Sequence, residues 1–307
     1  MTGTTAALHR PGTVGEATRV LAELGDADLL AGGTDLVPAL RAGTRRPRAI
    51  VALRRVLELR TRGVGADGIV VGAGVTYAEL AGWAPAPGLA ATARAVGSAQ
   101  IRNAGTVGGA LGSANPRGDL LTFLTAADAQ VLTCSARRGP RTVPLPDFLL
   151  AGRRRGELVT AVRIPPTHGP QVFLKIGGRQ AAYPALVSCA LVVDRADGRV
   201  GCAFGGVAAT PPRARAAEQF ALAEIDWSAV PTGARAQALA RRFGELVTEA
   251  ARSAAAQLPE GPRDPADYRW HAVGVLAARA LARCLAAPAG AEGPAAEGRG
   301  GGTVAGS

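Results

Sequence analysis

Two short segments of this sequence combine glycines with a hydroxyl side chain, a pattern suited to anion binding. The first is Ala31-Gly32-Gly33-Thr34-Asp35-Leu36, which directly follows the apolar pair Leu29-Leu30. Consecutive glycines after a strand let backbone N–H groups turn toward one point and approach an anion closely. The hydroxyl of Thr34 would add a hydrogen bond to a pyrophosphate. An ordinary tight turn explains the same residues equally well.

The second segment is Arg102-Asn103-Ala104-Gly105-Thr106-Val107-Gly108-Gly109. Its glycines lose much conformational entropy on folding, and that cost makes sense where backbone must lie flat against a ligand. A loop between subdomains is the alternative interpretation. The two segments are about seventy residues apart. Together they favour a single dinucleotide held from two sides.

A third glycine pattern, Gly72-Ala73-Gly74-Val75-Thr76-Tyr77, follows a predicted strand and resembles a Rossmann fingerprint. Tyr77 stands where that fingerprint needs its third glycine, and a side chain there would obstruct helix–strand packing. No acidic residue occurs about twenty positions further on, where Arg94 to Gly97 lie. We therefore reject a Rossmann site and expect another fold to bind the cofactor.

Residues for acid–base or metal chemistry are sparse. The three histidines, His9, His168 and His271, lack metal-ligand spacing, and no Gly-x-Ser-x-Gly elbow occurs. The four cysteines are far apart, without a Cys-x-x-Cys pair, so we expect no zinc site and no iron–sulfur cluster. The chain is predicted to bind a redox cofactor, with a flavin as the reactive group.

Composition narrows the classes of protein further. The net charge of +11 comes almost wholly from scattered arginines, since Lys175 is the single lysine, and aromatic residues make up only 4%. Nucleic-acid binding is therefore disfavoured, and a basic surface that meets an acidic partner is preferred. Apolar runs fall short of the roughly 18–20 residues that cross a bilayer, and no secretory signal is visible. We expect a cytoplasmic protein that does not contact membranes.

Apolar spacing and glycine or proline breaks predict the elements that position these segments. The predicted helices are residues 15–24, a short one from 76 to 80, 89–96, 120–127, 234–256 and 268–285; the predicted strands are 29–31, 49–53, 69–72, 129–133, 173–176, 186–193 and 200–204. A glycine-dense passage covers 97–118. Prolines at 165, 166 and 170 mark the clearest domain boundary. The Gly/Ala/Pro/Glu-rich stretch over 287–307 is predicted to be a disordered tail.

These motifs, in this order, resemble the FAD-binding (medium) subunit of the xanthine dehydrogenase and carbon monoxide dehydrogenase family of molybdenum hydroxylases. The resemblance covers nearly all of residues 8–285. It is strongest at Gln100 to Gly109 and continues to Asp119-Leu120. Further matches are Leu8 to Pro11, Leu29 to Leu36, Ile69 to Thr76, Gly156 to Val159, Lys175 to Arg179, Phe204 to Ala208 and Tyr268 to Trp270.

The resemblance implies an α+β protein with the vanillyl-alcohol-oxidase-type (PCMH-like) FAD-binding fold. That fold consists of two α/β subdomains, about 1–57 and 58–168, which together form the FAD-binding domain over 1–168. A C-terminal α+β flavoprotein domain over 169–286 follows. The cofactor-binding residues that it implies are Leu29, Leu30, Ala31, Gly32, Gly33, Thr34, Asp35, Leu36, Gly105, Thr106, Val107, Gly108, Gly109, Ser113, Asp119, Leu158, Val159 and Lys175.

Two of these residues have specific expectations. Asp119 would accept hydrogen bonds from ribose hydroxyls, or would cap the helix that starts at Leu120. Lys175 matches a lysine near the isoalloxazine, where a fixed positive charge would stabilise the reduced flavin. The chain departs from the family pattern at Ala110, where Asn is frequent, and at Tyr183, where Asp is common.

By the same resemblance the chain is an electron-transfer subunit. It would take electrons from a 2Fe–2S small subunit, which a molybdopterin large subunit reduces, and pass them to NAD, oxygen or another acceptor. A dimer of heterotrimers is one arrangement that the family suggests. Two alternatives remain: a free-standing FAD-dependent oxidase or dehydrogenase that acts directly on a small molecule, and a scaffold that has lost FAD.

Overall fold

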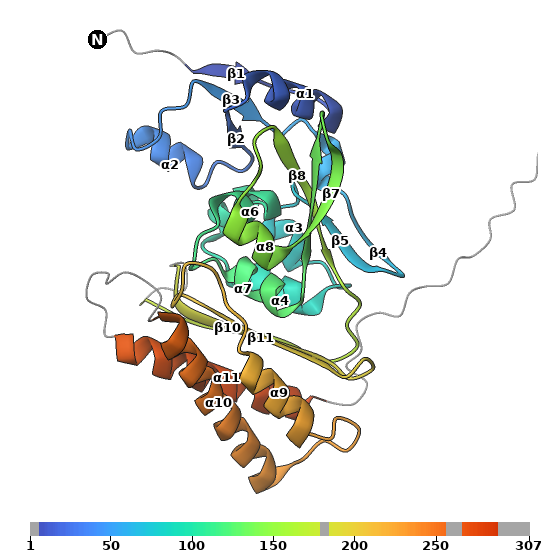
Figure 1. Cartoon of the computed structure of the whole chain (residues 1–307), viewed down its shortest axis with the longest axis vertical. Coiled ribbons are helices and arrows are strands. Elements are labelled where there is room, and N and C mark those ends of the chain that lie inside the picture. Colours follow the sequence, from blue (N-terminus) through green and yellow to red (C-terminus); the bar gives the residue numbers. More distant parts are fainter. Residues whose placement is uncertain (1–5, 179–183, 256–265, 288–307) are drawn as a thin grey trace, which may run out of the picture.

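The computed structural model describes residues 6–178, 184–255 and 266–287. Within these ranges the strands form three sheets, with helices packed between and below them (Figure 1). No helix in this part of the chain is long and apolar enough to span a bilayer. Tyr183 and the predicted tail, apart from Ala287, lie outside the described residues.

The first sheet is parallel and has the order β1 (Ala7–His9), β3 (Ala49–Ala52), β2 (Asp28–Leu30). Helix α1 (Val14–Leu24) begins at Thr13, whose side chain accepts a hydrogen bond from the Glu16 N–H, and it ends at Gly25. Parallel strands end at the same edge of a sheet. The glycine segment after β2, which leads into α2 (Leu36–Arg41), therefore lies beside the residues that follow β3.

The second sheet is antiparallel throughout, with the order β4-β5-β8-β6-β7. Because β5 pairs antiparallel with both neighbours, no parallel crossover follows Gly72, and a Rossmann site is excluded structurally as well. Its strands are β4 (Arg62–Gly65), β5 (Gly68–Gly72), β6 (Gln130–Ser135), β7 (Gly139–Pro144) and β8 (Glu157–Ile164).

A layer of short helices packs between the second and third sheets (Figure 1). The glycine-dense passage 97–118, in which no helix was predicted, contains two of these helices. Ser98 and Thr106 each accept a hydrogen bond from a backbone N–H at the start of a helix, which stabilises both helices despite their glycines. The elements of this region are η1 (Leu57–Arg60), α3 (Tyr77–Ala81), α4 (Pro87–Ala95), α5 (Ala99–Ala104), α6 (Val107–Ser113), α7 (Asp119–Ala126) and α8 (Leu145–Ala151).

The third sheet is antiparallel with the order β11-β10-β9 and is covered on both faces. Helices α4 and α7 contact it from one side, and α9 and α11 contact it from the other. Alternate residues of β10 point into two different hydrophobic cores, one on each face of the sheet. This explains why the sequence of β10 is apolar almost throughout. The elements here are β9 (Gln171–Gly177), β10 (Ala185–Asp194), β11 (Arg199–Gly205), α9 (Arg215–Glu224), α10 (Gly233–Ala255) and α11 (Ala266–Ala286).

Helix α7 joins the two halves of the molecule. All eight of its residues are buried. The hydroxyl of Thr122 lies 3.0 Å from that of Ser188 in β10. At the carboxyl end of α7, the guanidinium of Arg213 donates to the Thr125 carbonyl and pairs with Asp128 and Glu218. These contacts hold the helix whose first residue is Asp119.

Candidate functional site

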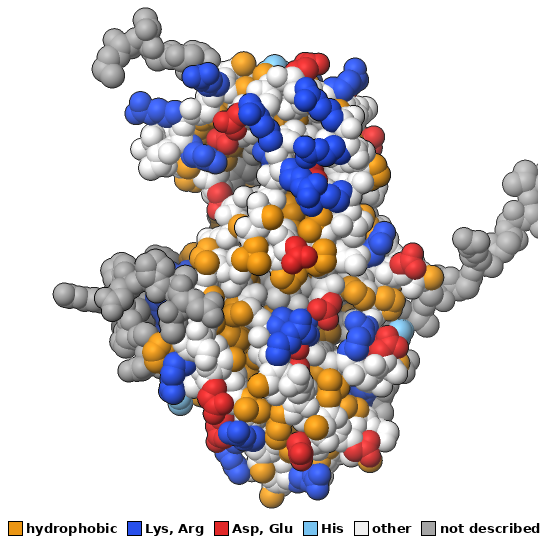
Figure 2. Space-filling model, in the orientation of Figure 1, with side chains coloured by type: hydrophobic (Ala, Val, Ile, Leu, Met, Phe, Trp, Pro, Cys, Tyr) orange, Lys and Arg blue, Asp and Glu red, His pale blue; other side chains and the backbone are white. Residues whose placement is uncertain are grey.

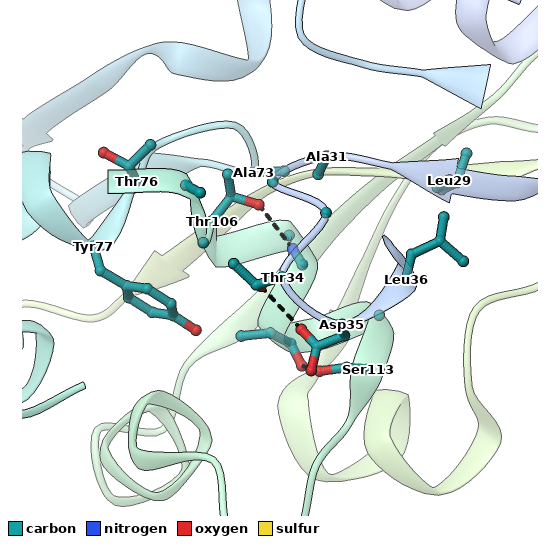
Figure 3. A pocket seen from close by; sticks show the side chains of 18 of the residues that line it. Leu29, Ala31, Thr34, Asp35, Leu36, Ala73, Thr76, Tyr77, Thr106 and Ser113 are labelled. Carbon is teal, nitrogen blue, oxygen red and sulfur yellow. Dashed lines mark hydrogen bonds between the residues drawn. The ribbon is translucent and has the colours of Figure 1, made fainter. Parts of the chain in front are cut away.

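A single long cleft brings the two glycine segments together. Its volume is about 1040 Å³, near the upper end of the range of roughly 300–1,000 Å³ typical of small-molecule sites. Fifteen of the eighteen predicted cofactor-binding residues line it, and Leu30, Val107 and Lys175 do not. Figure 3 shows the loop after β2 facing Thr76, Tyr77 and Thr106 across this space.

The first glycine segment presents unused hydrogen-bond donors to the cleft. Among the described residues, no acceptor lies within hydrogen-bond range of the backbone N–H groups of Gly32, Gly33, Thr34 and Asp35. Gly33 has a φ of +74°, a conformation that side chains rarely tolerate. Successive free N–H groups in such a turn form a concave anion site. The sequence-based interpretation of this loop therefore has a structural basis.

The second segment also lines the cleft, and several of its backbone N–H groups are bonded within the protein. The N–H groups of Val107 and Gly108 donate to the carbonyls of Val75 and Ala73, and that of Gly109 donates to the Thr106 hydroxyl. They are not free for a ligand. Gly108 is required instead because a Cβ there would lie 2.7 Å from the Cβ of Ala73. These three N–H groups are bonded within the protein, and the segment forms part of the wall of the cleft.

The two segments also touch each other. An ideal Cβ built on Gly32 would lie 1.9 Å from the carbonyl oxygen of Ala104 and 2.6 Å from its carbon. Residue 32 must therefore lack a side chain for the loop after β2 to reach the end of α5. This glycine is explained by contact between chain segments, whereas Gly33 is explained by its backbone conformation.

Asp119 and Lys175 form a buried ion pair at the edge of the cleft. Lys175 Nζ lies 2.7 Å from Asp119 Oδ2 and 2.6 Å from the carbonyl oxygen of Ala95. Oδ1 of Asp119 is buried and has no hydrogen-bond partner. Burial raises the pKa of this carboxyl group, and Lys175 only partly offsets that rise. A buried, unpartnered oxygen in a cleft is suited to accept a hydrogen bond from a ligand.

The alternative role of Asp119 as a helix cap is wrong. Gly118 is the N-cap of α7, and no side chain caps that end. Lys175, expected near the isoalloxazine, is not among the residues that line the cleft. Its ammonium group instead contacts Asp119, a carboxylate that does line the cleft. The pair thus places a positive charge one side chain away from the cleft.

The remaining predicted residues divide between cleft and core. Leu158 and Val159 are buried in β8 and line the cleft, so strand core and cleft wall are both correct descriptions. Val107 is buried in the core, 1% exposed. Leu30 lies in β2 outside the lining. Ala110, one of the departures from the family pattern, lines the cleft from α6 without a polar side-chain group.

The charge of the lining suits an anionic ligand. Five arginines and three aspartates line the cleft, a net of two positive charges among the described residues. Arg54 follows β3, at the edge of the parallel sheet where the first glycine segment also lies. Within the described part of the chain its guanidinium has no ion pair or hydrogen bond. The arginines are Arg45, Arg54, Arg60, Arg117 and Arg153, and the aspartates are Asp28, Asp35 and Asp119.

Sequence reasoning missed Tyr77 and Arg54 as members of the site. Tyr77 was considered only as an obstacle to a Rossmann turn. Arg54 is one of many arginines, and nothing in its sequence context separates it from its neighbour Arg55. The usable signal for Arg54 was its place directly after a predicted parallel strand, where ligands collect in α/β sheets.

Comparison with known proteins gives a consistent family. Residues 4–167 match the family model described as the FAD-binding domain in molybdopterin dehydrogenase. The chain is 29% identical to the carbon monoxide dehydrogenase medium chain of Hydrogenophaga pseudoflava, covering 90% of this chain and 97% of that one. It is 31% identical to a putative xanthine dehydrogenase FAD-binding subunit of Escherichia coli K12, covering 70% of this chain and 79% of the relative.

Solved structures agree with these relatives. The fold matches a chain of the Cu,Mo-CO dehydrogenase in its cyanide-inactivated form with a TM-score of 0.77 at 27% identity, covering 93% of this chain and 99% of that chain. It matches quinoline 2-oxidoreductase from Pseudomonas putida 86 with a TM-score of 0.78 at 25% identity, with the same coverage.

Proposed function

This chain belongs to the family of FAD-binding domains of molybdopterin dehydrogenases, and we propose that it carries the flavin step of a multi-subunit dehydrogenase. It is an FAD-binding oxidoreductase component of the molybdenum hydroxylase type. The finer proposal is that electrons arrive from an iron–sulfur partner and leave to NAD, oxygen or another acceptor. Bound FAD supplies the redox chemistry of that transfer.

The observation that carries the proposal is the set of free N–H groups from Gly32 to Asp35, which face a cleft of net positive charge. A doubly anionic diphosphate matches both features. Asp119 adds a buried acceptor oxygen for hydroxyl or N–H donors of the same ligand. FAD fits this combination because it joins a diphosphate to groups that donate hydrogen bonds.

The chain's own residues then have separate roles. The loop after β2 binds the anionic part of the cofactor, and the Gly105–Gly109 backbone lies close enough to exclude water from its other side. Leu158 and Val159 provide an apolar wall from β8. Lys175 holds Asp119 in place and maintains its charge. On this proposal residues 1–168 form the FAD-binding domain, of the vanillyl-alcohol-oxidase (PCMH-like) type, and residues 169–286 form the C-terminal domain.

The proposed partners are a molybdopterin large subunit and a 2Fe–2S small subunit. The names of the relatives, a medium chain and an FAD-binding subunit, support a place in a larger complex. Figure 2 shows basic side chains spread over the upper part of one face, around the first sheet and α1. Such a surface suits an acidic partner, since complementary charge speeds and orients association.

The test is purification of the chain alone and together with its partners. We expect the isolated chain to bind stoichiometric FAD and to transfer electrons only from artificial dyes. Co-expression with the partners should recover a complex that contains iron and molybdenum. A chain without affinity for FAD would contradict the cofactor assignment. Turnover of a small molecule by the isolated chain would instead support the free-standing oxidase or dehydrogenase.

A further inference from the structure

Tyr77 lies in the middle of the cleft, between elements that are far apart in the sequence. It is the first residue of α3 and lines the cleft together with the two glycine segments. In Figure 3 its hydroxyl points toward the side of the cleft where Thr34, Asp35 and Ser113 lie. No role in the preceding proposal requires this side chain.

The backbone of Tyr77 is held in place, and one side of its ring packs against Gly105. Its backbone N–H donates to the carbonyl of Gly105 over 3.1 Å. The preceding residue, Thr76, forms a reciprocal cap with Glu79 that secures the start of α3. The ring lies against the backbone of Gly105, where an added Cβ would come within 2.7 Å of the ring atom Cε2. Position 105 must therefore lack a side chain for the Tyr77 ring to take this place.

The hydroxyl group of Tyr77 is a donor without an acceptor. Among the described residues it makes no hydrogen bond, and its oxygen is not one of the fully buried polar atoms that lack a partner. It is thus open to the cleft. Burial, followed by the charges of Asp35 and Asp119, raises the pKa of Tyr77 above its usual value. The phenol keeps its proton at physiological pH and can donate it in a hydrogen bond.

We propose that the Tyr77 hydroxyl donates a hydrogen bond to the diphosphate of FAD, opposite the free N–H groups of Gly32 to Asp35. This inference rests on the proposed function and adds a contact to it. The first glycine segment attracts the anion from one side of the cleft, and Tyr77 is the neutral donor on the facing side. Asp35 and Asp119 also line the cleft and would repel a diphosphate, whereas the neutral Tyr77 hydroxyl can donate to it.

The test replaces the hydroxyl alone, with Tyr77→Phe. The matched control is Tyr268→Phe in α11, because Tyr268 is exposed and does not line the cleft. Full-length apoprotein is titrated with FAD and, separately, with riboflavin, which lacks phosphate. The Kd for FAD should rise about tenfold in Tyr77→Phe, the range expected for one hydrogen bond to a charged group, and should stay at the wild-type value in the control. The Kd for riboflavin should not change.

Two results would overturn the inference. One is an FAD affinity of Tyr77→Phe within about twofold of wild type, since a lost hydrogen bond costs more than that. The other is an equal loss of affinity for riboflavin, which would place the contact outside the diphosphate. A matching unfolding midpoint of the apoprotein verifies that the variant folds. Failure of the wild type to bind FAD would contradict the proposed function itself and is thereby distinguishable.

Discussion

The ammonium group of Lys175 in β9 lies 2.7 Å from Oδ2 of Asp119, the first residue of α7, so one ion pair links the third sheet to the cleft. Both side chains are largely buried, 14% and 5% exposed. The pair leaves Oδ1 of Asp119 without a protein partner. The carboxylate is therefore held by a lysine of the third sheet and lines the cleft.

Removal of the lysine charge should destabilise the folded apoprotein. In Lys175→Met the free energy of unfolding at pH 7 should fall by about 3 kcal/mol, because a buried carboxylate loses its counter-charge. Burial raises the pKa of folded Asp119 above its usual value of 3.8. The contribution of Asp119 to stability is therefore greatest below pH 3.8 and declines as the pH rises through the folded-state pKa. Without Lys175 this decline in the free energy of unfolding should be larger, as urea denaturation across a pH series would measure.

The double variant Lys175→Met with Asp119→Asn is the control for this pair. It removes both charges, so its stability should vary less with pH than that of Lys175→Met alone. If the single variant has the same pH dependence as wild type, the ion pair is not what keeps Asp119 charged. The reduction potential of the flavin in the loaded protein is an independent readout. A lysine with a purely structural role would leave that potential unchanged.

Gly32→Ala should separate the two glycine segments. Its new Cβ would meet the Ala104 carbonyl at 1.9 Å, and relief requires backbone movement at a cost of about 1–3 kcal/mol. We expect a lower unfolding midpoint and a marked loss of FAD affinity. Gly82→Ala is the matched control, since a Cβ at Gly82 meets nothing within 4 Å. Equal behaviour of the two variants would mean that the loop after β2 adapts freely.

Arg54→Met should weaken FAD binding through charge alone. Both Arg54 and its neighbour Arg55 are exposed, but only Arg54 lines the cleft, which makes Arg55→Met the matched control. The Kd for FAD should rise several-fold in Arg54→Met, and its dependence on salt concentration should become shallower. Fluorescence titration at low and high ionic strength measures both. Identical salt dependence in the two variants would remove Arg54 from the site.

Glu157 should determine part of the acid stability of the protein. Its carboxylate in β8 accepts hydrogen bonds from Arg141, Thr133 and the Arg154 N–H. Burial alone would raise the pKa of Glu157, but these hydrogen bonds hold that pKa below its usual value of 4.5. Glu157 therefore stabilises the fold above pH 4.5, and this stabilisation is lost as the pH falls through the folded-state pKa.

Glu157→Gln should therefore lose about 2 kcal/mol of unfolding free energy at pH 7, the size of a hydrogen bond to a charged group. The difference from wild type should shrink at lower pH, where Glu157 is protonated. Asp147→Asn is the comparison, because Asp147 is exposed and has no ion pair among the described residues. A difference that stays constant with pH would contradict this role.

Much of the fold was predictable where local signals agree. The strands of the third sheet and helices α1, α10 and α11 were predicted within a few residues, because apolar spacing and glycine or proline breaks coincide there. Helices α5 and α6 were missed. Their glycines have low helix propensity, yet capping by Ser98 and Thr106 and close packing stabilise them in the folded chain.

The sequence by itself determined which residues could meet an anionic cofactor. Glycine at 32 and 33, the hydroxyls of Thr34 and Thr106, and the unique Lys175 carry chemical information that does not depend on the fold. Only the tertiary structure decided how each acts. It left the N–H groups of Gly32 to Asp35 free, bonded those of Val107 to Gly109 within the protein, paired Lys175 with Asp119 and placed Tyr77 in the cleft. The physical reason is that hydrogen-bond occupancy and side-chain reach depend on which distant segments pack together.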